Sequence, residues 1–250
     1  MFLLTLALAV LVGVTLGLFG GGGSILTVPL LIYVTGLDTK TAIATSLVVV
    51  GVTSMGALVT HARAGRVQWR TGFIFGATAM VGAYAGGRLG PMVPDVVLMV
   101  GFALMMLATS VAMIRGRRGE PPAGERKEAS VLLVLAEGVV VGLVTGIVGA
   151  GGGFLVVPAL VLLGGLPMAT AVGTSLLVIA LKSFAALAGY LSAVQIDWGL
   201  AAWVTALALV GSVIGGWLAG RIDPDRLRKS FGIFVLGMGV FVLAQTGLSA

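Results

Sequence analysis

The chain has 250 residues, of which 58% are hydrophobic and only 10% are charged. Soluble domains carry about 25% charged residues, so this composition excludes a water-soluble globular protein of this size. The absence of cysteine excludes disulfides and thiolate metal sites, and the single histidine excludes histidine clusters. The net charge is +6, and the basic residues lie in short loops between apolar runs. There they indicate membrane topology and headgroup contacts rather than nucleic-acid binding.

The first apolar block, residues 1–34, is too long for one membrane span, which needs about 20 residues. Residues 1–20 lack the basic start of a signal peptide, and their pattern returns in mid-chain, so we treat them as part of the fold. Four consecutive glycines, 20–23, interrupt the block. We expect a hairpin here, in which one helix enters the membrane, the chain breaks at the glycines, and a short half-helix at Ser24–Val34 follows.

Three further apolar blocks follow at residues 41–60, 71–90 and 96–114, and each fits one span. The segment 115–130 contains two prolines and eight ionised side chains, which predicts an exposed linker. The pattern then returns as apolar blocks at 131–164, interrupted by glycines, and at 170–192, 199–219 and 231–248.

An internal repeat explains this return. A shift of 129 residues superposes glycines 13, 17, 20, 22 and 23 on glycines 142, 146, 149, 151 and 152, Pro29 on Pro158, and Thr45-Ser46 on Thr174-Ser175. We call residues related by this shift repeat mates. Such a repeat indicates one structural unit used twice, so the sequence predicts membrane repeats at 1–114 and 131–250, joined by the linker at 115–130.

The basic residues predict that the second repeat is inverted. If each long block enters and returns, the loops 61–70, 115–130 and 220–230 share one side with twelve Lys and Arg, and the other side keeps Lys40 and Arg88. A single crossing would leave no bias. An excess of basic residues marks the cytoplasmic side, so the linker is predicted to be cytoplasmic. The expected fold is an all-α integral membrane protein with two inverted-topology repeats, each a glycine-broken hairpin plus three transmembrane helices, about 8–10 membrane segments in all.

Each glycine break is a candidate anion site. Lipid cannot satisfy the polar backbone groups of a broken helix, so the break must line a cavity or be buried in protein. The segment after it starts with free N–H groups and a partial positive charge, and inverted halves would bring two such ends to one midplane site. Ser24 could cap the first. Pro29 and Pro158 would either lie in the first turn or kink the segment. Tight helix crossings are the alternative explanation for the glycines.

Lys182, near the middle of block 170–192, is the charged candidate. Such a side chain costs about 2.5–3.5 kcal/mol in the membrane centre, which makes it a functional candidate by default. It could bind an anion and exchange a proton with it, or it could snorkel to the interface. Glu137 could pair with Lys182, carry a proton or lie near the headgroups. Their repeat mates are Thr53 and Leu8, so any such site is asymmetric.

Hydroxyl groups are the third kind of candidate. Thr45-Ser46 and Thr174-Ser175 lie early in their blocks, and Ser54 and Ser183 lie deeper. They could donate to an anion without the cost of a buried charge, or they could bond back to their own helix. His61, with three nearby arginines, is most simply part of a headgroup belt, and Trp69 and Trp198 suit interfacial anchoring.

Two stretches of the chain match each other and a known pattern. GLFGGGGSILTVPLL followed by TAIATSL, and GIVGAGGGFLVVPAL followed by TAVGTSL, resemble the two signature halves of the TauE/SafE sulfite-exporter family, also called the toluene-sulfonate uptake permease family. The resemblance covers essentially the whole chain. It implies a transporter of sulfite, organosulfonates or related anions in a bacterial or archaeal cytoplasmic (inner) membrane. Both export and uptake are assigned within the family, so direction does not follow.

We therefore expect a secondary transporter, with export favoured, that works by alternating access around one midplane site. It is not expected to be an enzyme or to need a cofactor, because the catalytic inventory is poor. Its expected partners are the anion and membrane lipids, with a homodimer left open. An anion channel and a non-transporting scaffold subunit are the alternatives. The candidate binding residues are Gly20, Gly21, Gly22, Gly23, Ser24, Thr45, Ser46, Gly149, Gly151, Gly152, Gly153, Thr174, Ser175 and Lys182, with Lys182 and Glu137 as candidates for proton coupling.

Overall fold

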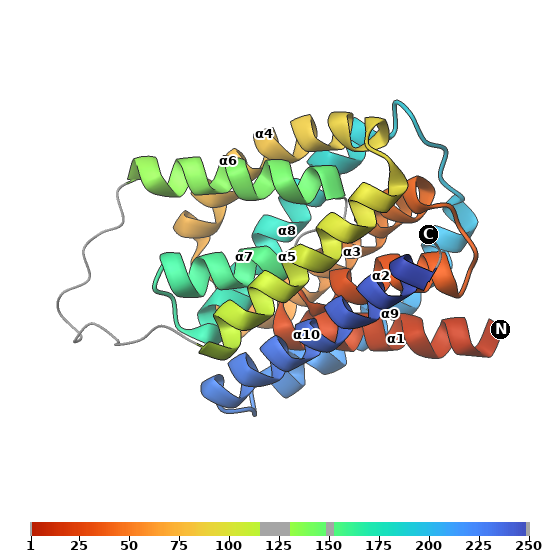
Figure 1. The fold of residues 1–250 in the computed structure, drawn as a ribbon. Helices are drawn as coiled ribbons and strands as arrows, with labels where there is room; N and C mark the ends of the chain where they lie inside the picture. Colours follow the sequence, from red (N-terminus) through yellow and green to blue (C-terminus); the bar gives the residue numbers. More distant parts are fainter. Residues whose placement is uncertain (1, 116–130, 149–152, 249–250) are drawn as a thin grey trace.

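The computed structural model describes residues 2–115, 131–148 and 153–248, and these are helical without any strand (Figure 1). Within these described ranges, five helices are long and apolar enough to cross a membrane, which confirms the predicted all-α, multi-pass membrane protein. The elements are α1 (Phe2–Phe19), α2 (Gly22–Tyr33), α3 (Thr39–Arg63), α4 (Trp69–Leu89), α5 (Asp95–Arg115), α6 (Val131–Val148), α7 (Gly153–Pro158), α8 (Met168–Tyr190), α9 (Trp198–Ala219) and α10 (Pro224–Leu248), with a 3-10 turn at Gly90–Met92 and a π-helical turn at Ala159–Leu163.

The first apolar block breaks at the predicted glycines. Helix α1 ends at Phe19, Gly20 has a φ of +71°, which only glycine adopts readily, and α2 packs against α1. The C-terminal end of α1 lies beside the C-terminal end of α3, whereas α2 leads into the start of α3, so the chain reverses direction at the break. With 12 residues, α2 is about 18 Å long, which makes it the half-helix that the sequence predicts.

The two halves of the chain interlock. Helix α1 packs on α9 and α4 packs on α6, while α3 packs on α8 and α5 on α10. Exchanging the halves converts the α1–α9 contact into the α6–α4 contact and leaves the α3–α8 and α5–α10 contacts unchanged. The start of α1 and the end of α10 lie at one end of the molecule, and the ends of α5 and α6 that flank the linker lie at the other (Figure 1). An inverted repeat would produce this pattern, and the inverted relation and the repeat boundaries stay predictions.

Glycines allow the closest of these contacts. Gly13 and Gly17 on α1 and Gly211 and Gly215 on α9 face the backbone of the opposite helix, where a Cβ at any of them would overlap a carbonyl group. The repeat mates of the first two, Gly142 and Gly146 on α6, face α4 in the same way. Small residues spaced four apart are typical of helix pairs in membranes. These glycines, which lie outside the breaks, allow close helix packing. Gly22 and Gly23 of the first break also lie close to carbonyl groups of α1, so the tight-crossing alternative for the breaks stays open.

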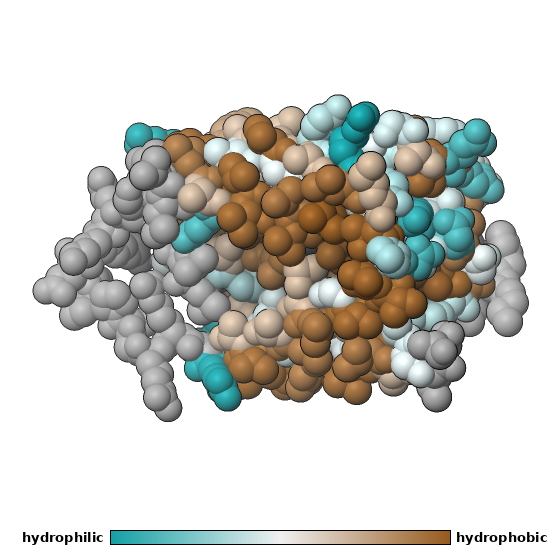
Figure 2. All heavy atoms as spheres, turned by 45° about the horizontal axis from the view of Figure 1, so that its top comes forward, coloured by the Kyte–Doolittle hydropathy of each residue, from teal (hydrophilic) through white to brown (hydrophobic). Residues whose placement is uncertain are grey.

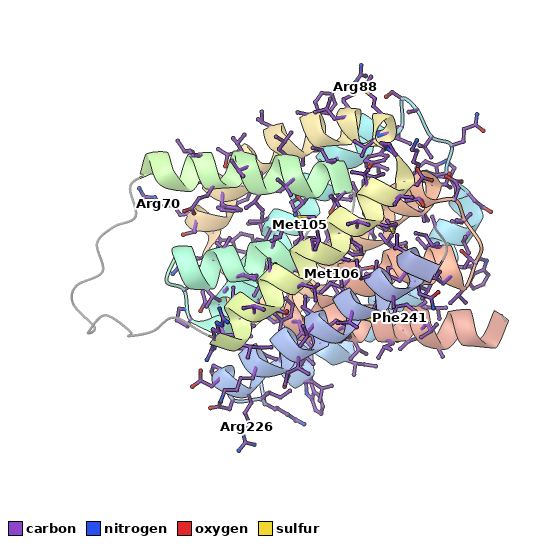
Figure 3. The ribbon with its side chains drawn as sticks, viewed as in Figure 1. Arg70, Arg88, Met105, Met106, Arg226 and Phe241 are labelled. Atoms are coloured by element: carbon purple, nitrogen blue, oxygen red, sulfur yellow. The ribbon has the colours of Figure 1, made fainter. Side chains whose placement is uncertain are left out.

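The surface agrees with a lipid environment. Large apolar side chains are exposed along the helices, and Trp203 on α9 is 69% exposed. Figure 2 shows a broad apolar surface over the middle of the molecule, with hydrophilic residues gathered toward its ends. Arg70 and Arg88 lie at opposite ends of α4 (Figure 3). Water could not cover so much apolar surface without aggregation, so the belt marks the part of the protein that lies in the hydrocarbon.

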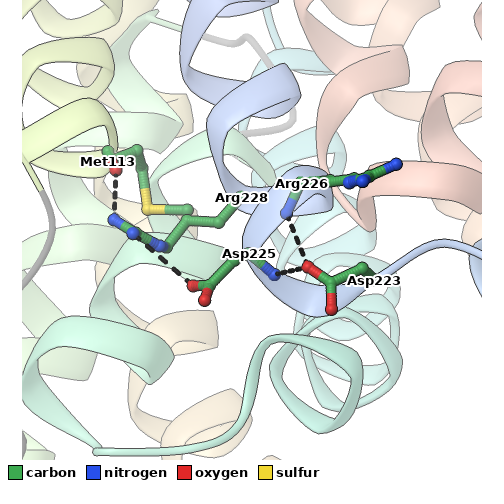
Figure 4. A network of polar contacts seen from close by, with 5 residues as sticks. All are labelled: Met113, Asp223, Asp225, Arg226 and Arg228. Carbon is green, nitrogen blue, oxygen red and sulfur yellow. Dashed lines mark hydrogen bonds and ion pairs between the residues drawn. The ribbon is translucent and has the colours of Figure 1, made fainter.

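Polar contacts fix the α10 end of the bundle. Asp223 accepts hydrogen bonds from the backbone N–H groups of Asp225 (3.1 Å) and Arg226 (3.2 Å), which caps α10 (Figure 4). Arg228 donates to the carbonyl of Met113 in the last turn of α5, at 2.7 Å. A guanidinium at a helix C-terminus also suits the negative end of the helix dipole. These contacts hold α5 and α10 in register at this end of the molecule.

Candidate functional site

The two glycine breaks meet inside the protein. A Cβ on Gly21 would overlap the carbonyl group of Gly153 and lie 2.6 Å from the nitrogen of Phe154, and a Cβ on Gly153 would lie 2.6 Å from the Cα of Gly21. These glycines, together with Gly22 and Gly23, are buried. The structure thus brings the start of α2 against the start of α7. Of the other predicted glycines, Gly149, Gly151 and Gly152 lie outside the described residues.

Ser24 does not cap the short helix, contrary to the prediction. Helix α2 begins two residues earlier, Gly21 occupies the cap position without a side-chain bond, and the Ser24 hydroxyl donates to the Gly21 carbonyl at 2.7 Å. The first N–H groups of a helix have no partner within it. The N–H groups of Gly22, Gly23 and Ser24 therefore lie together in a buried first turn that no described side chain caps, and such turns can bind anions.

Pro29 and Pro158 do not lie in the first turn of their helices, which was the first of the two positions that the sequence allowed. Because α2 begins at Gly22, Pro29 lies well inside the helix and leaves the carbonyl of Ile25 without its usual i+4 donor. Pro158 ends α7 and is followed directly by the π-helical turn Ala159–Leu163. Helix α2 thus continues past its proline to Tyr33, whereas α7 ends at its proline after six residues.

His61 satisfies the other side of the first break, which corrects its assignment to a headgroup belt. It is only 1% exposed, and its Nε2 lies 3.0 Å from the carbonyl of Gly17 in the last turn of α1. Its repeat mate is Tyr190, whose hydroxyl donates to the carbonyl of Ile147 in the last turn of α6, at 2.7 Å. The last carbonyls of a helix lack intrahelical donors. Each half therefore uses one side chain to satisfy the helix end before its break, a pair that the 129-residue shift could have revealed.

The predicted Thr-Ser pairs are used in different ways. Ser175 donates to the carbonyl of Val172 at 2.8 Å and lies 3.5 Å from the carbonyl of Gly20, so it reaches the first break. Thr174 accepts a hydrogen bond from the backbone N–H of Gln68 at 3.0 Å.

The corresponding pair in the first half differs from this. The Thr45 hydroxyl is buried and has no partner among the described residues, and Ser46 donates to the carbonyl of Ile43 at 2.7 Å. Thr45 therefore has an unused hydroxyl among the described residues, and the Thr174 hydroxyl, which accepts from Gln68, can still donate its own proton.

Lys182 is buried in the bundle, at 2% exposure. Its Nζ donates to the Thr145 hydroxyl on α6 at 3.0 Å, and Thr145 in turn donates to the carbonyl of Gly142 at 3.2 Å. Lys182 lies two turns after Ser175 on the same face of α8, so the break and the ammonium are about 10 Å apart along the helix. The repeat mates of Lys182 and Thr145 are Thr53 and Leu16, so this polar pair is confined to the second half.

Glu137 does not pair with Lys182. It precedes Thr145 by eight residues in α6, which is about 12 Å along the helix, and the ion pairs of the described residues do not include Lys182. An unpaired buried charge costs several kcal/mol. An anion bound beside Lys182 would supply the missing negative charge.

The site is chemically one-sided. Its described groups are donors, namely the N–H groups at the start of α2, the hydroxyl of Thr45 and the ammonium of Lys182. No cluster of three metal-ligating side chains occurs in the described part of the chain. Backbone N–H groups and an ammonium can only donate, so they favour an anionic ligand, and the Thr45 hydroxyl can donate to it as well.

Comparison with known proteins indicates a membrane transporter. The model of the family "Sulfite exporter TauE/SafE" matches residues 5–242. A probable membrane transporter protein of Xylella fastidiosa is 34% identical over 244 residues, which cover 96% of this chain and 94% of the relative. Similar proteins with the same description occur in Methanocaldococcus jannaschii (28% identical, 97% of both chains) and Bacillus subtilis (28% identical, 91% of this chain and 89% of the relative). No solved structure matches the chain.

Proposed function

The chain belongs to the TauE/SafE sulfite exporter family, and from this premise we propose that it exports a small sulfur-containing anion, such as sulfite or an organosulfonate, across the cytoplasmic membrane of a bacterium or archaeon. The family match and the relatives support a membrane transporter rather than an enzyme. The choice of a sulfur-containing anion rests on the family description, and the choice of an anion rests independently on the donors of the site.

Lys182 is the observation that carries the proposal. The Lys182 amine is buried in a helix of membrane-spanning length and is hydrogen-bonded to a hydroxyl. It has no acidic partner among the described residues, so it lacks a counter-charge when it is protonated. Charged side chains at membrane depth mark substrate and ion pathways. A transported anion would neutralise Lys182 while bound, which makes the ammonium a binding group. Lys182 and Glu137 are also the candidates for proton coupling, as two separate groups.

The contact between the breaks supports alternating access over a channel. The backbones of Gly21 and Gly153 touch, so there is no space between them for an ion to pass in this conformation. The exchange symmetry of the helix contacts supports two related halves that rock against each other around a central site, as in other transporters with inverted repeats. Gly20–Gly23 and Gly153 would then be the moving contact, with Thr45 and Lys182 beside the anion.

Labelled sulfite flux into proteoliposomes tests the function. Saturable flux with counter-transport supports the transporter, and a response to an imposed pH gradient would show proton coupling. Flux that rises linearly with concentration and lacks counter-transport would indicate a channel. Protein that moves neither sulfite nor an organosulfonate such as methanesulfonate above the level of empty liposomes contradicts the proposal.

A further inference from the structure

The buried hydroxyl groups of this protein fall into two classes. Most donate to a carbonyl three or four residues earlier in their own helix, as Thr27, Ser110 and Ser212 do at 2.7–2.8 Å. Four buried hydroxyls have no partner within the described ranges, and they belong to Thr45, Thr53, Ser54 and Ser183. All four lie on α3 or α8. Among the described residues, the buried hydroxyls without a partner are therefore concentrated on one pair of helices that pack against each other.

Two of these hydroxyls share the α3–α8 interface. Ser54 and Ser183 are repeat mates and are fully buried. Ser183 lies against Gly51, because a Cβ on Gly51 would be 3.4 Å from the Cβ of Ser183. Gly51 and Ser54 are three residues apart and lie on the same face of α3. The serines are therefore offset by about one turn, or about 5 Å along the helices, which a small oxyanion can bridge. Gly51 is the central residue of the 25-residue helix α3, so the pair lies near mid-membrane.

The neighbouring charge decides what this pair can bind. A hydroxyl can donate to an anion, coordinate a cation or bind water. Lys182 directly precedes Ser183 and is 2% exposed. Within the described residues its amine uses one of three donor positions, on Thr145. A cation between the helices would be repelled by this ammonium, whereas an anion would be attracted.

We propose that Ser54 and Ser183 donate hydrogen bonds to two oxygens of the transported oxyanion at the crossing of α3 and α8, with Lys182 as the counter-charge. This inference rests on the proposed function and moves the central binding contact from the glycine breaks to the crossing of these helices. Each half of the chain contributes one serine, so the bound oxyanion bridges the halves at the interface about which they would rock. The XO3 group shared by sulfite and sulfonates has enough oxygens to accept from both.

Alanine substitution tests the pair through transport. Ser54→Ala and Ser183→Ala should each raise the half-saturating concentration of labelled sulfite about tenfold or more, because each removes a hydrogen bond to a charged ligand. Ser212→Ala is the matched control, since Ser212 is a buried serine whose hydroxyl already bonds to its own helix, and its half-saturation should not change. Identical half-saturation in all three variants would overturn the assignment while leaving the transport function in place.

A second experiment does not need flux. The chain has no cysteine, so Ser54→Cys and Ser183→Cys can be labelled individually in purified protein with a small thiol reagent. Methanesulfonate is the probe, because sulfite would itself attack the reagent. It should slow labelling at both positions and leave Ala64→Cys, in an exposed loop, unaffected. Labelling that is insensitive to the probe, or absent at both sites, would refute the pair. Protection without any flux would keep the binding pair and remove the transport proposal.

Discussion

Lys182 should affect stability and activity in opposite directions. Its ammonium is buried without an acidic partner in the described structure, so Lys182→Met removes the cost of an uncompensated charge while it keeps an unbranched side chain. We expect the Tm in detergent to rise by about 2–4 °C per kcal/mol gained, and saturable sulfite flux to fall at least about tenfold. Thermal unfolding and proteoliposome flux measure the two effects.

Lys229→Met, at an exposed position on α10, is the control for the loss of a positive charge. Lys229→Met should change neither the Tm nor the sulfite flux. A Lys182→Met variant with normal flux would remove Lys182 from the mechanism, whatever happens to its Tm.

Tyr190 offers a test of how the helix end before the second break is held. Tyr190→Phe removes only the hydroxyl that donates to the Ile147 carbonyl and takes away the hydrogen bond of that partly buried carbonyl, which should destabilise the protein by about 1–3 kcal/mol. Thermal unfolding measures the loss. Tyr84→Phe, at an exposed position on α4, is the matched control and should leave the Tm unchanged. An equal Tm for both variants would show that the hydroxyl does not contribute.

At the scale of the elements, the contact between α2 and α7 is the most sensitive to added volume. Gly21→Ala places a Cβ into the backbone of Gly153, and the backbone can make room only if the two short helices separate. We expect sulfite flux to fall about tenfold or more, with a loss of stability of about 1–3 kcal/mol. Flux and thermal unfolding check both expectations.

Gly101→Ala is the control for this change. Gly101 lies in the middle of α5, and its Cβ would meet nothing within 4 Å. Alanine there should stabilise the helix by about 0.5–1 kcal/mol without changing flux. If Gly21→Ala behaved like Gly101→Ala, the contact between the breaks would not be part of the transport cycle.

For the whole molecule, the inverted relation makes a paired topology prediction. Ala64 and Ala193 are repeat mates, and both are exposed just after the ends of α3 and α8. In an inverted repeat they lie on opposite sides of the membrane, with Ala64 beside the basic loop on the cytoplasmic side. Ala64→Cys and Ala193→Cys in the cysteine-free chain should react with an impermeant thiol reagent from opposite sides. Labelling of both from one side would exclude the inverted fold.

The sequence alone was enough to determine the class of the protein and the position of the first break. Hydropathy and helix length are local properties, so the membrane-spanning segments can be read along the chain. The break follows from four glycines in a run, because the φ of +71° at Gly20 is readily adopted only by glycine. The 129-residue repeat also predicted that the same unit occurs twice, although the rotation that relates the two copies is not a local property.

Only the tertiary structure decided which polar groups meet. Lys182 bonds to Thr145 rather than Glu137, His61 is buried against Gly17 rather than exposed to headgroups, and the unpaired hydroxyls concentrate on α3 and α8. Each outcome depends on the rotation and depth at which one helix packs on another. This rotation and depth are set by glycine contacts between helices that are far apart in the chain. The residue pattern of one helix therefore does not show which side chains of another helix will pack against it.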